Sequence, residues 1–212
     1  MNKFNPDFPT YVIVDNFYPN PDVVRQYALT SAEYQKTITH EQNWPGLQST
    51  TVELPPMELF ESILGEKVKP TPNSGCGNFR ITAKKDPCKQ LIHFDPNVNQ
   101  RWAGVCYLSL PEHYTLPSGK IIDAGTKFWR HNKYGCEDAL VNIPELRGVG
   151  ALKNFFETDG LDESKWTEVM NVPIKYNRAV FFRPWLWHSI GKQFGTTREN
   201  SRLTHLFFLD KA

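Results

Sequence analysis

The sequence lacks a hydrophobic run of the length, about 18 residues, that a membrane-spanning helix requires. Its opening stretch, MNKFNPDFPTYVIVDNF, also lacks the apolar core of a signal peptide. No block of one charge sign is present, because 24 basic and 23 acidic side chains are mixed along the chain and give a net charge of +1. These absences predict a soluble, cytoplasmic protein whose partners are neither membranes nor nucleic acids.

Cysteine is scarce, and its spacing excludes the usual motifs. The four residues are Cys76, Cys88, Cys106 and Cys136, and no two of them form a C-x-x-C pair. In a protein that is not exported, such a pattern favours reduced thiols over a disulfide framework or a structural zinc site.

Apolar and aromatic residues are plentiful, at 40% and 13% of the chain, which is enough for a packed core. With no repeat, low-complexity tract or linker, we expect a single domain over 1–212. In its first part, 1–75, the residue pattern predicts a strand at 11–17 and helices at 19–34 and 55–65. We expect these helices to cover the remaining part, 76–212.

From residue 76 onward the pattern changes to short β-branched or aromatic runs separated by Pro, Gly and Asn. The runs are CGNFRITA, KQLIHF, WAGVCYLSL, KIIDAGTKFW, RAVFFRPWLWHSI and RLTHLFFLD. A helix-like insertion interrupts them at about 138–170. Many short strands predict a mainly β fold with some α, a sandwich or barrel core at 76–212 with the N-terminal helices packed on it.

Two strand ends carry candidate metal ligands. His93 and Asp95 form an H-x-D pair in LIHFDPN, and His188 ends the run NRAVFFRPWLWH. If both strands belong to one antiparallel core, two imidazoles and a carboxylate can hold one cation and leave coordination positions open, which suits non-haem Fe(II). The alternatives are polar residues at a strand end for the pair and a hydrogen-bonded core histidine for His188.

An arginine lies on the last predicted strand. Arg202 opens RLTHLFFLD, where alternation places it on one face with Thr204, Leu206 and Phe208. Its planar guanidinium could pair with a carboxylate of a ligand that also chelates the metal. Arg198 competes for this role from the preceding turn.

Five segments in order resemble a known family. These are HFDPN, VCYLS, DAGTKFWRH, PWLWHSIG and RLTHLFF, which together span about residues 76–210. They resemble the Fe(II)/2-oxoglutarate-dependent dioxygenases, particularly the prolyl-hydroxylase-like branch. The resemblance implies a double-stranded β-helix core of the jelly-roll or cupin-like type.

The resemblance also implies residue roles. His93, Asp95 and His188 would bind Fe(II), while Arg202 and Tyr107 would bind the distal carboxylate of the cosubstrate 2-oxoglutarate. O2 would be the second cosubstrate, and an oxidised product, by default a hydroxylated one, would form with succinate and CO2. The substrate class, small molecule or peptide and protein side chain, stays open, as does self-association.

The chain departs from many prolyl hydroxylases on the strand before H-x-D, which carries Phe79, Arg80 and Thr82 but no tyrosine. The insertion before His188 is also long and belongs to a subgroup. Substrate identity therefore does not follow from the resemblance.

The segment KFWRHNKYG, with Trp129 and Arg130, mixes aromatic and basic residues beside the expected site. It could form part of the substrate mouth, together with Trp187, or be a solvated turn after a strand. A different class of function stays open as well: a cupin-like metal-binding protein without 2-oxoglutarate chemistry, acting as a binding or assembly module.

Overall fold

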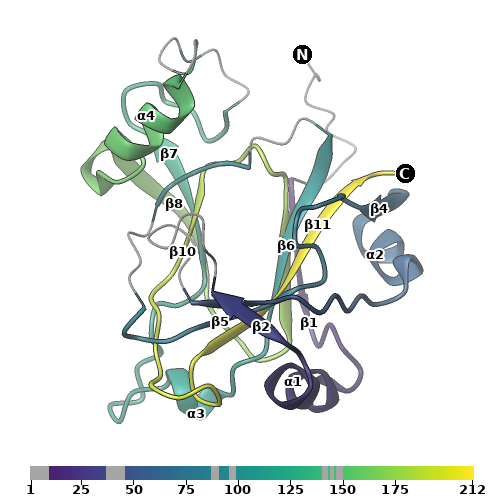
Figure 1. The fold of residues 1–212 in the computed structure, drawn as a ribbon. Coiled ribbons are helices and arrows are strands. Elements are labelled where there is room, and N and C mark those ends of the chain that lie inside the picture. The colour runs from purple at the N-terminus through teal and green to yellow at the C-terminus, as the bar shows by residue number, and fades with distance from the viewer. Residues whose placement is uncertain are drawn as a thin grey trace.

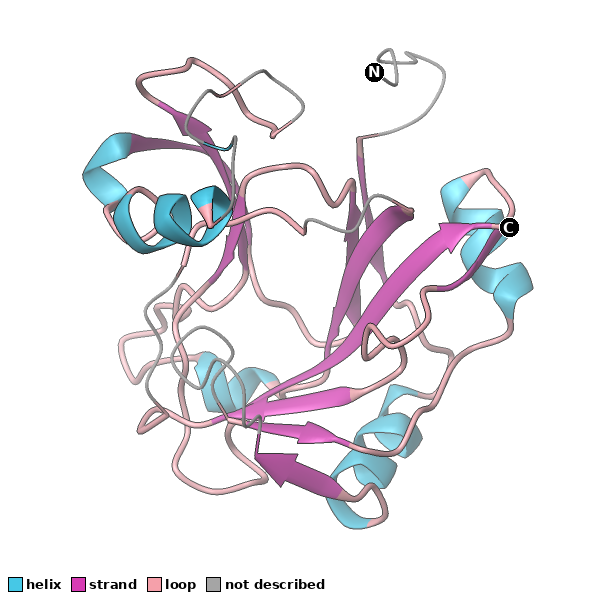
Figure 2. Cartoon of the chain, turned by 45° about the horizontal axis from the view of Figure 1, so that its top comes forward, coloured by secondary structure: helices cyan, strands magenta, loops and turns pink. Residues whose placement is uncertain are grey.

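A computed structural model of the chain describes residues 10–36, 46–86, 91–95, 99–139, 143, 146 and 150–212. These residues form two antiparallel sheets and a few helices (Figures 1 and 2). The larger sheet has the order β1-β9-β6-β11-β5-β3-β2, with β4 beside β11, and the smaller has the order β10-β7-β8. The mainly β expectation is thereby confirmed.

The strand bounds are as follows. The larger sheet contains β1 (Tyr11–Asp15), β2 (Tyr34–Lys36), β3 (Leu47–Ser49), β4 (Val68–Pro70), β5 (Phe79–Thr82), β6 (Gln100–Tyr107), β9 (Arg178–Phe182) and β11 (Arg202–Lys211). The smaller sheet contains β7 (Thr126–His131), β8 (Trp166–Val172) and β10 (His188–Ile190).

One face of the larger sheet is covered by two N-terminal helices, α1 (Pro21–Thr30) and α2 (Met57–Leu64). Phe60 of α2 is fully buried against Phe181 of β9 and Phe207 of β11. Side chains on a strand alternate between the two faces of the sheet. The neighbours of Phe207 in β11 therefore point to the opposite face.

That opposite face looks toward the smaller sheet (Figure 1). Phe182 of β9 packs edge-on against Phe128 of β7, with 5.2 Å between ring centroids. Val180 and Val172 belong to the same buried cluster. The apolar interior between the sheets thus joins segments that are far apart in the chain.

The N-terminal part contributes more than helices. The strand expected at 11–17 forms as β1 and pairs with β9, and β2, β3 and β4 extend the larger sheet. The helix expected at 19–34 ends at Thr30, because Tyr34 already pairs with Ser49 as part of β2.

The second N-terminal helix is α2 (Met57–Leu64), within the expected range 55–65. Two prolines precede it, and Gly65 ends it in the left-handed conformation, with a φ of 71°. Glycine adopts this conformation without the Cβ clash that other residues suffer, so the stop signal worked as expected.

The helix-like insertion expected at about 138–170 is correct only in part. The structure has helix α4 (Ala151–Thr158) and a short 3-10 helix, η2 (Glu163–Lys165). Residues 140–142, 144–145 and 147–149 lie outside the described residues. From Trp166 the prediction is wrong, because β8 begins there and pairs with β7. A further short helix, α3 (Pro111–Tyr114), follows β6.

Three of the four cysteines, Cys76, Cys106 and Cys136, are buried and form no disulfide, while Cys88 lies outside the described residues. None of the helices in the described ranges has the length and apolarity needed to cross a membrane.

Candidate metal centre

The candidate ligands His93 and His188 meet through the backbone. His93 N–H donates to the His188 carbonyl oxygen at 2.9 Å, and His188 N–H donates to the His93 carbonyl oxygen at 2.8 Å. This isolated antiparallel bridge places the two residues directly opposite each other, so their side chains leave the same face. The imidazole centroids lie 4.3 Å apart.

Each imidazole is oriented in the same way. Nδ1 of His93 is 3.0 Å from the Leu91 carbonyl oxygen, and Nδ1 of His188 is 2.8 Å from the Leu186 carbonyl oxygen. A carbonyl only accepts, so Nδ1 carries the hydrogen and donates in both rings. Nε2 is then the nitrogen with the lone pair, which is the arrangement that orients metal-binding histidines.

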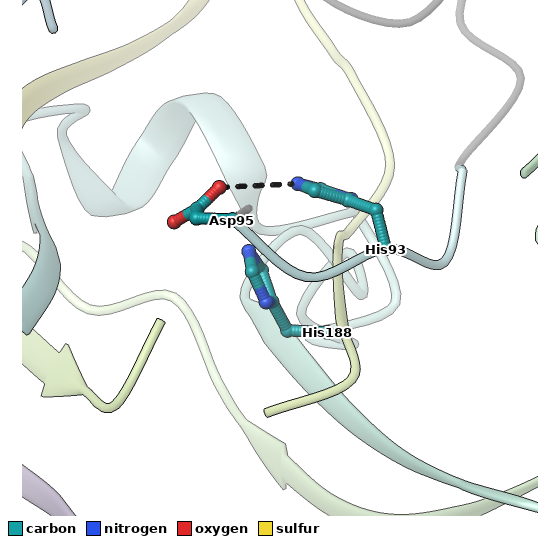
Figure 3. A group of neighbouring side chains, drawn as sticks. All are labelled: His93, Asp95 and His188. Carbon is teal, nitrogen blue, oxygen red and sulfur yellow. Dashed lines mark ion pairs between the residues drawn. The ribbon is translucent and has the colours of Figure 1, made fainter. Parts of the chain in front are cut away.

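Asp95 completes the group. Its backbone N–H donates to the Pro184 carbonyl oxygen at 2.8 Å, which fixes the chain just after His93. Its Oδ1 lies 3.9 Å from Nε2 of His93, and Gln100 Nε2 approaches Oδ2 at 3.4 Å. Figure 3 shows the three side chains directed toward one another.

One ligand atom from each of His93, Asp95 and His188 lies within 4.8 Å of the other two. Two neutral nitrogen donors and one carboxylate oxygen make a donor set that suits divalent first-row metals, and three protein ligands leave positions open for other molecules. The residues therefore fit a metal ion such as Fe(II). The sequence prediction that these three side chains converge is correct.

Burial shifts the pKa values of two of the candidate ligands, Asp95 and His188. It raises the pKa of the Asp95 carboxyl, against the opposing effect of His93. Burial also lowers the pKa of His188 well below the usual value, and the neighbouring His93 acts in the same direction. His188 is therefore neutral at neutral pH, as a ligand must be, while the partly buried Asp95 carboxylate is disfavoured without a cation beside it.

The three residues lie on the wall of a cavity of about 110 Å³. Thr204, Leu206 and Phe208 of β11 form part of the opposite wall, together with Arg202. This is the face that alternation along the last strand predicts, with Leu203 and Phe207 buried in the cluster on the other side.

Of the two arginines that the sequence offered, Arg202 lines this cavity and Arg198 does not. Arg202 is only 3% exposed, and its Nε donates to the Ala124 carbonyl oxygen at 3.0 Å. Arg198 instead reaches the end of α1, where its Nη2 lies 3.3 Å from the Ala28 carbonyl oxygen. Which of the two arginines binds a cosubstrate carboxylate stays a prediction, and the position of Arg202 in the cavity lining favours Arg202.

Tyr107 is fully buried beside Arg202, whose guanidinium carbon lies 5.7 Å from the tyrosine ring centroid. Its hydroxyl is 2.6 Å from Thr126 Oγ1, and Thr126 lines the cavity. Either hydroxyl can be the donor in this contact, and when Thr126 donates, the Tyr107 hydroxyl keeps its own hydrogen for another acceptor. The sequence-based role of Tyr107 stays a prediction.

The three residues suggested for substrate contact are not among the described residues that line the cavity. Trp187 is fully buried in a cluster with Trp166 and Phe155. Trp129 is also buried, and its Nε1 donates to Ser189 Oγ at 2.9 Å. Arg130 is half exposed and pairs with Glu137, with 3.0 Å between Nε and Oε1. Their role in substrate binding stays a prediction.

One cavity residue was missed as a candidate. Arg80 of β5 lines the same space as Arg202. The signal was present in the sequence FRIT, where Phe79 and Ile81 alternate with Arg80 and Thr82. Apolar and polar residues therefore point to opposite faces of this strand, and the polar face is the one that looks into the cavity.

Comparison with known proteins adds a family but no function. No curated protein matches the chain. A family model matches residues 7–209, a span that includes every candidate ligand and both cavity arginines. The chain therefore belongs to DUF6445, a family of unknown function.

Proposed function

We propose that the chain is a non-haem Fe(II)/2-oxoglutarate-dependent oxygenase that hydroxylates a substrate and releases succinate and CO2. One observation carries the proposal: the His93, Asp95 and His188 ligand atoms, within 4.8 Å of one another, share a cavity with the buried Arg202. The keto acid end of 2-oxoglutarate can chelate a metal, and its distal carboxylate can pair with a cation. This cavity offers a candidate site for each. The two facing antiparallel sheets support a double-stranded β-helix as the fold.

In this proposal His93, Asp95 and His188 hold the metal. Bound there, Fe(II) would supply the activation of O2 that is coupled to oxidative decarboxylation of the keto acid. The protein's own contribution is positional. The two Nδ1 hydrogen bonds fix the imidazoles, and the Asp95 carboxylate offsets part of the cation's charge.

Arg202 would bind the far carboxylate of 2-oxoglutarate. Its guanidinium is buried, so the ion pair forms in a medium of low dielectric constant, where it is stronger than at the surface. The contact between Arg202 Nε and the Ala124 carbonyl fixes the plane of the fork. A planar, oriented fork suits the bidentate geometry of a carboxylate.

Apolar residues complete the cavity. Leu206, Phe208 and Phe182 line it and limit the access of water to the reacting atoms. The cavity volume of about 110 Å³ leaves room for a small cosubstrate rather than for a macromolecular side chain as well. The substrate would therefore approach the metal from outside this space.

The test is succinate formation from 2-oxoglutarate, with and without Fe(II), which proceeds slowly in such enzymes even without the main substrate. We expect turnover in the wild-type protein and loss of it in Asp95→Asn, with His113→Asn, distant from the cavity, as the matched control. Equal succinate formation in the wild-type protein and Asp95→Asn would contradict the proposal. Metal binding without any dependence on 2-oxoglutarate would favour the cupin-like alternative.

A further inference from the structure

A second arginine lies beside Arg202 in the cavity. Arg80 of β5 is opposite Thr204 of β11, and Arg202 is opposite Thr82. Residues opposite each other on paired strands project to the same face, and so do residues two apart on one strand. Arg80 and Arg202 are therefore diagonal neighbours, and both side chains line the cavity.

Arg80 is held in place by a polar neighbour instead of an acid. Gln48 of β3 lies opposite Arg80 on its other side, and Gln48 Oε1 accepts a hydrogen bond from Arg80 Nη2. Gln48 Nε2 in turn approaches Asn78 Oδ1 at 3.4 Å. None of the ion pairs formed among the described residues includes Arg80. Its charge is thus oriented but not neutralised by a carboxylate of that part of the chain.

Three buried polar atoms around this position have no hydrogen-bond partner among the described residues. They are Arg80 Nε, Thr82 Oγ1 and Thr204 Oγ1. All three residues line the cavity. Buried polar groups are almost always paired in folded proteins, so a group of them around one cavity indicates that a polar ligand completes them.

The two arginines also repel each other. Burial and the charge of Arg202 together lower the pKa of Arg80 to about 10. Arg80 remains charged at neutral pH, so two like charges share one small space. An anion between them would relieve both the repulsion and the cost of burial.

From these contacts we infer that Arg80 is a second cationic contact for the distal carboxylate of the bound acid, so that an arginine pair from β5 and β11 makes the cavity selective for dicarboxylic 2-oxo acids. This inference rests on the proposed function for the identity of the acid. A guanidinium adds charge as well as a hydrogen bond, so the preference for a dianion should be strong.

The experiment compares two acids of equal carbon number on protein loaded with Mn(II) without oxygen. 2-Oxoglutarate has the distal carboxylate, and 2-oxopentanoate lacks it. In Arg80→Gln we expect the affinity for 2-oxoglutarate to fall about 10- to 100-fold, with the affinities for Mn(II) and 2-oxopentanoate unchanged. Arg101→Gln is the matched control, since Arg101 lies on β6 outside the cavity lining and pairs with Glu66.

A second variant guards against misfolding. Arg80→Lys keeps the charge but loses the fork, and we expect an intermediate loss of 2-oxoglutarate affinity. Equal 2-oxoglutarate affinity in the wild-type protein and in Arg80→Gln would overturn the inference.

A metal-free titration with glutarate separates this inference from the proposed function. If 2-oxoglutarate shows no metal-dependent binding, yet glutarate binds the wild-type protein and not Arg80→Gln, the oxygenase proposal fails and the arginine pair stands as a dicarboxylate site. If the wild-type protein binds neither acid, the arginine pair is overturned too.

Discussion

His93 and His188 exchange two backbone hydrogen bonds, of 2.9 and 2.8 Å, and so stand directly opposite each other. This pairing joins two distant parts of the chain and sets two imidazoles side by side before any metal is bound. The candidate site is therefore preorganised by the backbone. Its ligands need little rearrangement to bind a cation, which lowers the cost of binding.

Replacing one ligand should abolish metal binding without unfolding the protein. In His188→Asn the backbone bridge can remain, while one nitrogen donor is lost. We expect the affinity for Mn(II) or Fe(II) to fall at least tenfold, measured by calorimetry under anaerobic conditions. His113→Asn should bind the metal like the wild-type protein, and equal affinity in His188→Asn would exclude this residue as a ligand.

Metal binding should also stabilise the fold, because the partly buried Asp95 carboxylate is disfavoured without a cation beside it. At a metal concentration of about 100 times the dissociation constant, the free energy of unfolding should rise by about 3 kcal/mol. For a chain of this size the melting temperature should rise by about 5–10 °C. Thermal unfolding with and without a chelator measures this, and no shift in the wild-type protein would count against the site.

Arg202, at the start of β11, and Arg198, in the turn before it, should differ in their effect on 2-oxoglutarate binding. Arg202→Gln removes the buried guanidinium of the cavity, and we expect the affinity for 2-oxoglutarate to fall about 10- to 100-fold. Arg198→Gln loses contacts with the Ala28 and Ala32 carbonyl oxygens and with the Tyr34 ring, all outside the cavity lining, so 2-oxoglutarate binding should not change. The reverse order of effects would assign the carboxylate to Arg198.

Tyr107 tests how far the family resemblance extends. Tyr107→Phe removes the buried hydrogen bond with Thr126, and we expect the free energy of unfolding to fall by about 1 kcal/mol. Because Tyr107 is not among the described residues that line the cavity, 2-oxoglutarate affinity should change little. A tenfold loss in a binding titration would instead show that the hydroxyl donates to the ligand, as the resemblance implies.

His205 should make the fold sensitive to acid. Its Nε2 lies 2.8 Å from the Glu53 carbonyl oxygen and donates to it, so Nδ1 accepts from the Tyr18 hydroxyl at 2.8 Å. Burial lowers the pKa of His205 from 6.5 to about 4. As the pH falls below 6.5, His205 is therefore protonated in the unfolded chain while it stays neutral in the folded one.

Stability supplied by neutral His205 is present above pH 6.5 and is lost as the pH falls from 6.5 to about 4. The full loss is about 3 kcal/mol. Urea unfolding at a series of pH values measures it. His205→Gln should be less stable at neutral pH and show a smaller decrease over this window, and an unchanged slope would refute the assignment.

The sequence predicted the candidate metal ligands because their chemistry is local to strand ends. The H-x-D pair and His188 carry the donor types themselves, and the alternation of Arg202 with Leu203 is visible in the last strand. Which strands pair is not visible in such patterns. The position of Arg80 beside Arg202 depends on the register between β5 and β11, so only the structure could bring them together.

The errors have a similar cause. The helix-like reading of 138–170 failed at Trp166, because WTEVMNV lies at the edge of the small sheet and buries only its ends, Trp166 and Val172, fully. Its pairing with β7, rather than its own pattern, makes it a strand. Trp187, suggested as a substrate contact, is fully buried, and that role stays a prediction. The position of an aromatic residue next to His188 in the sequence does not indicate which face of the strand its side chain occupies.

The most direct measurement is an anaerobic titration of the Fe(II)-loaded protein with 2-oxoglutarate, followed by visible absorption. Chelation of the keto acid by ferrous iron gives a weak charge-transfer band. We expect this band in the wild-type protein, its absence in Asp95→Asn, and a shift to higher 2-oxoglutarate concentrations in Arg202→Gln. If the wild-type protein binds Fe(II) and gives no band at saturating 2-oxoglutarate, the oxygenase proposal is wrong.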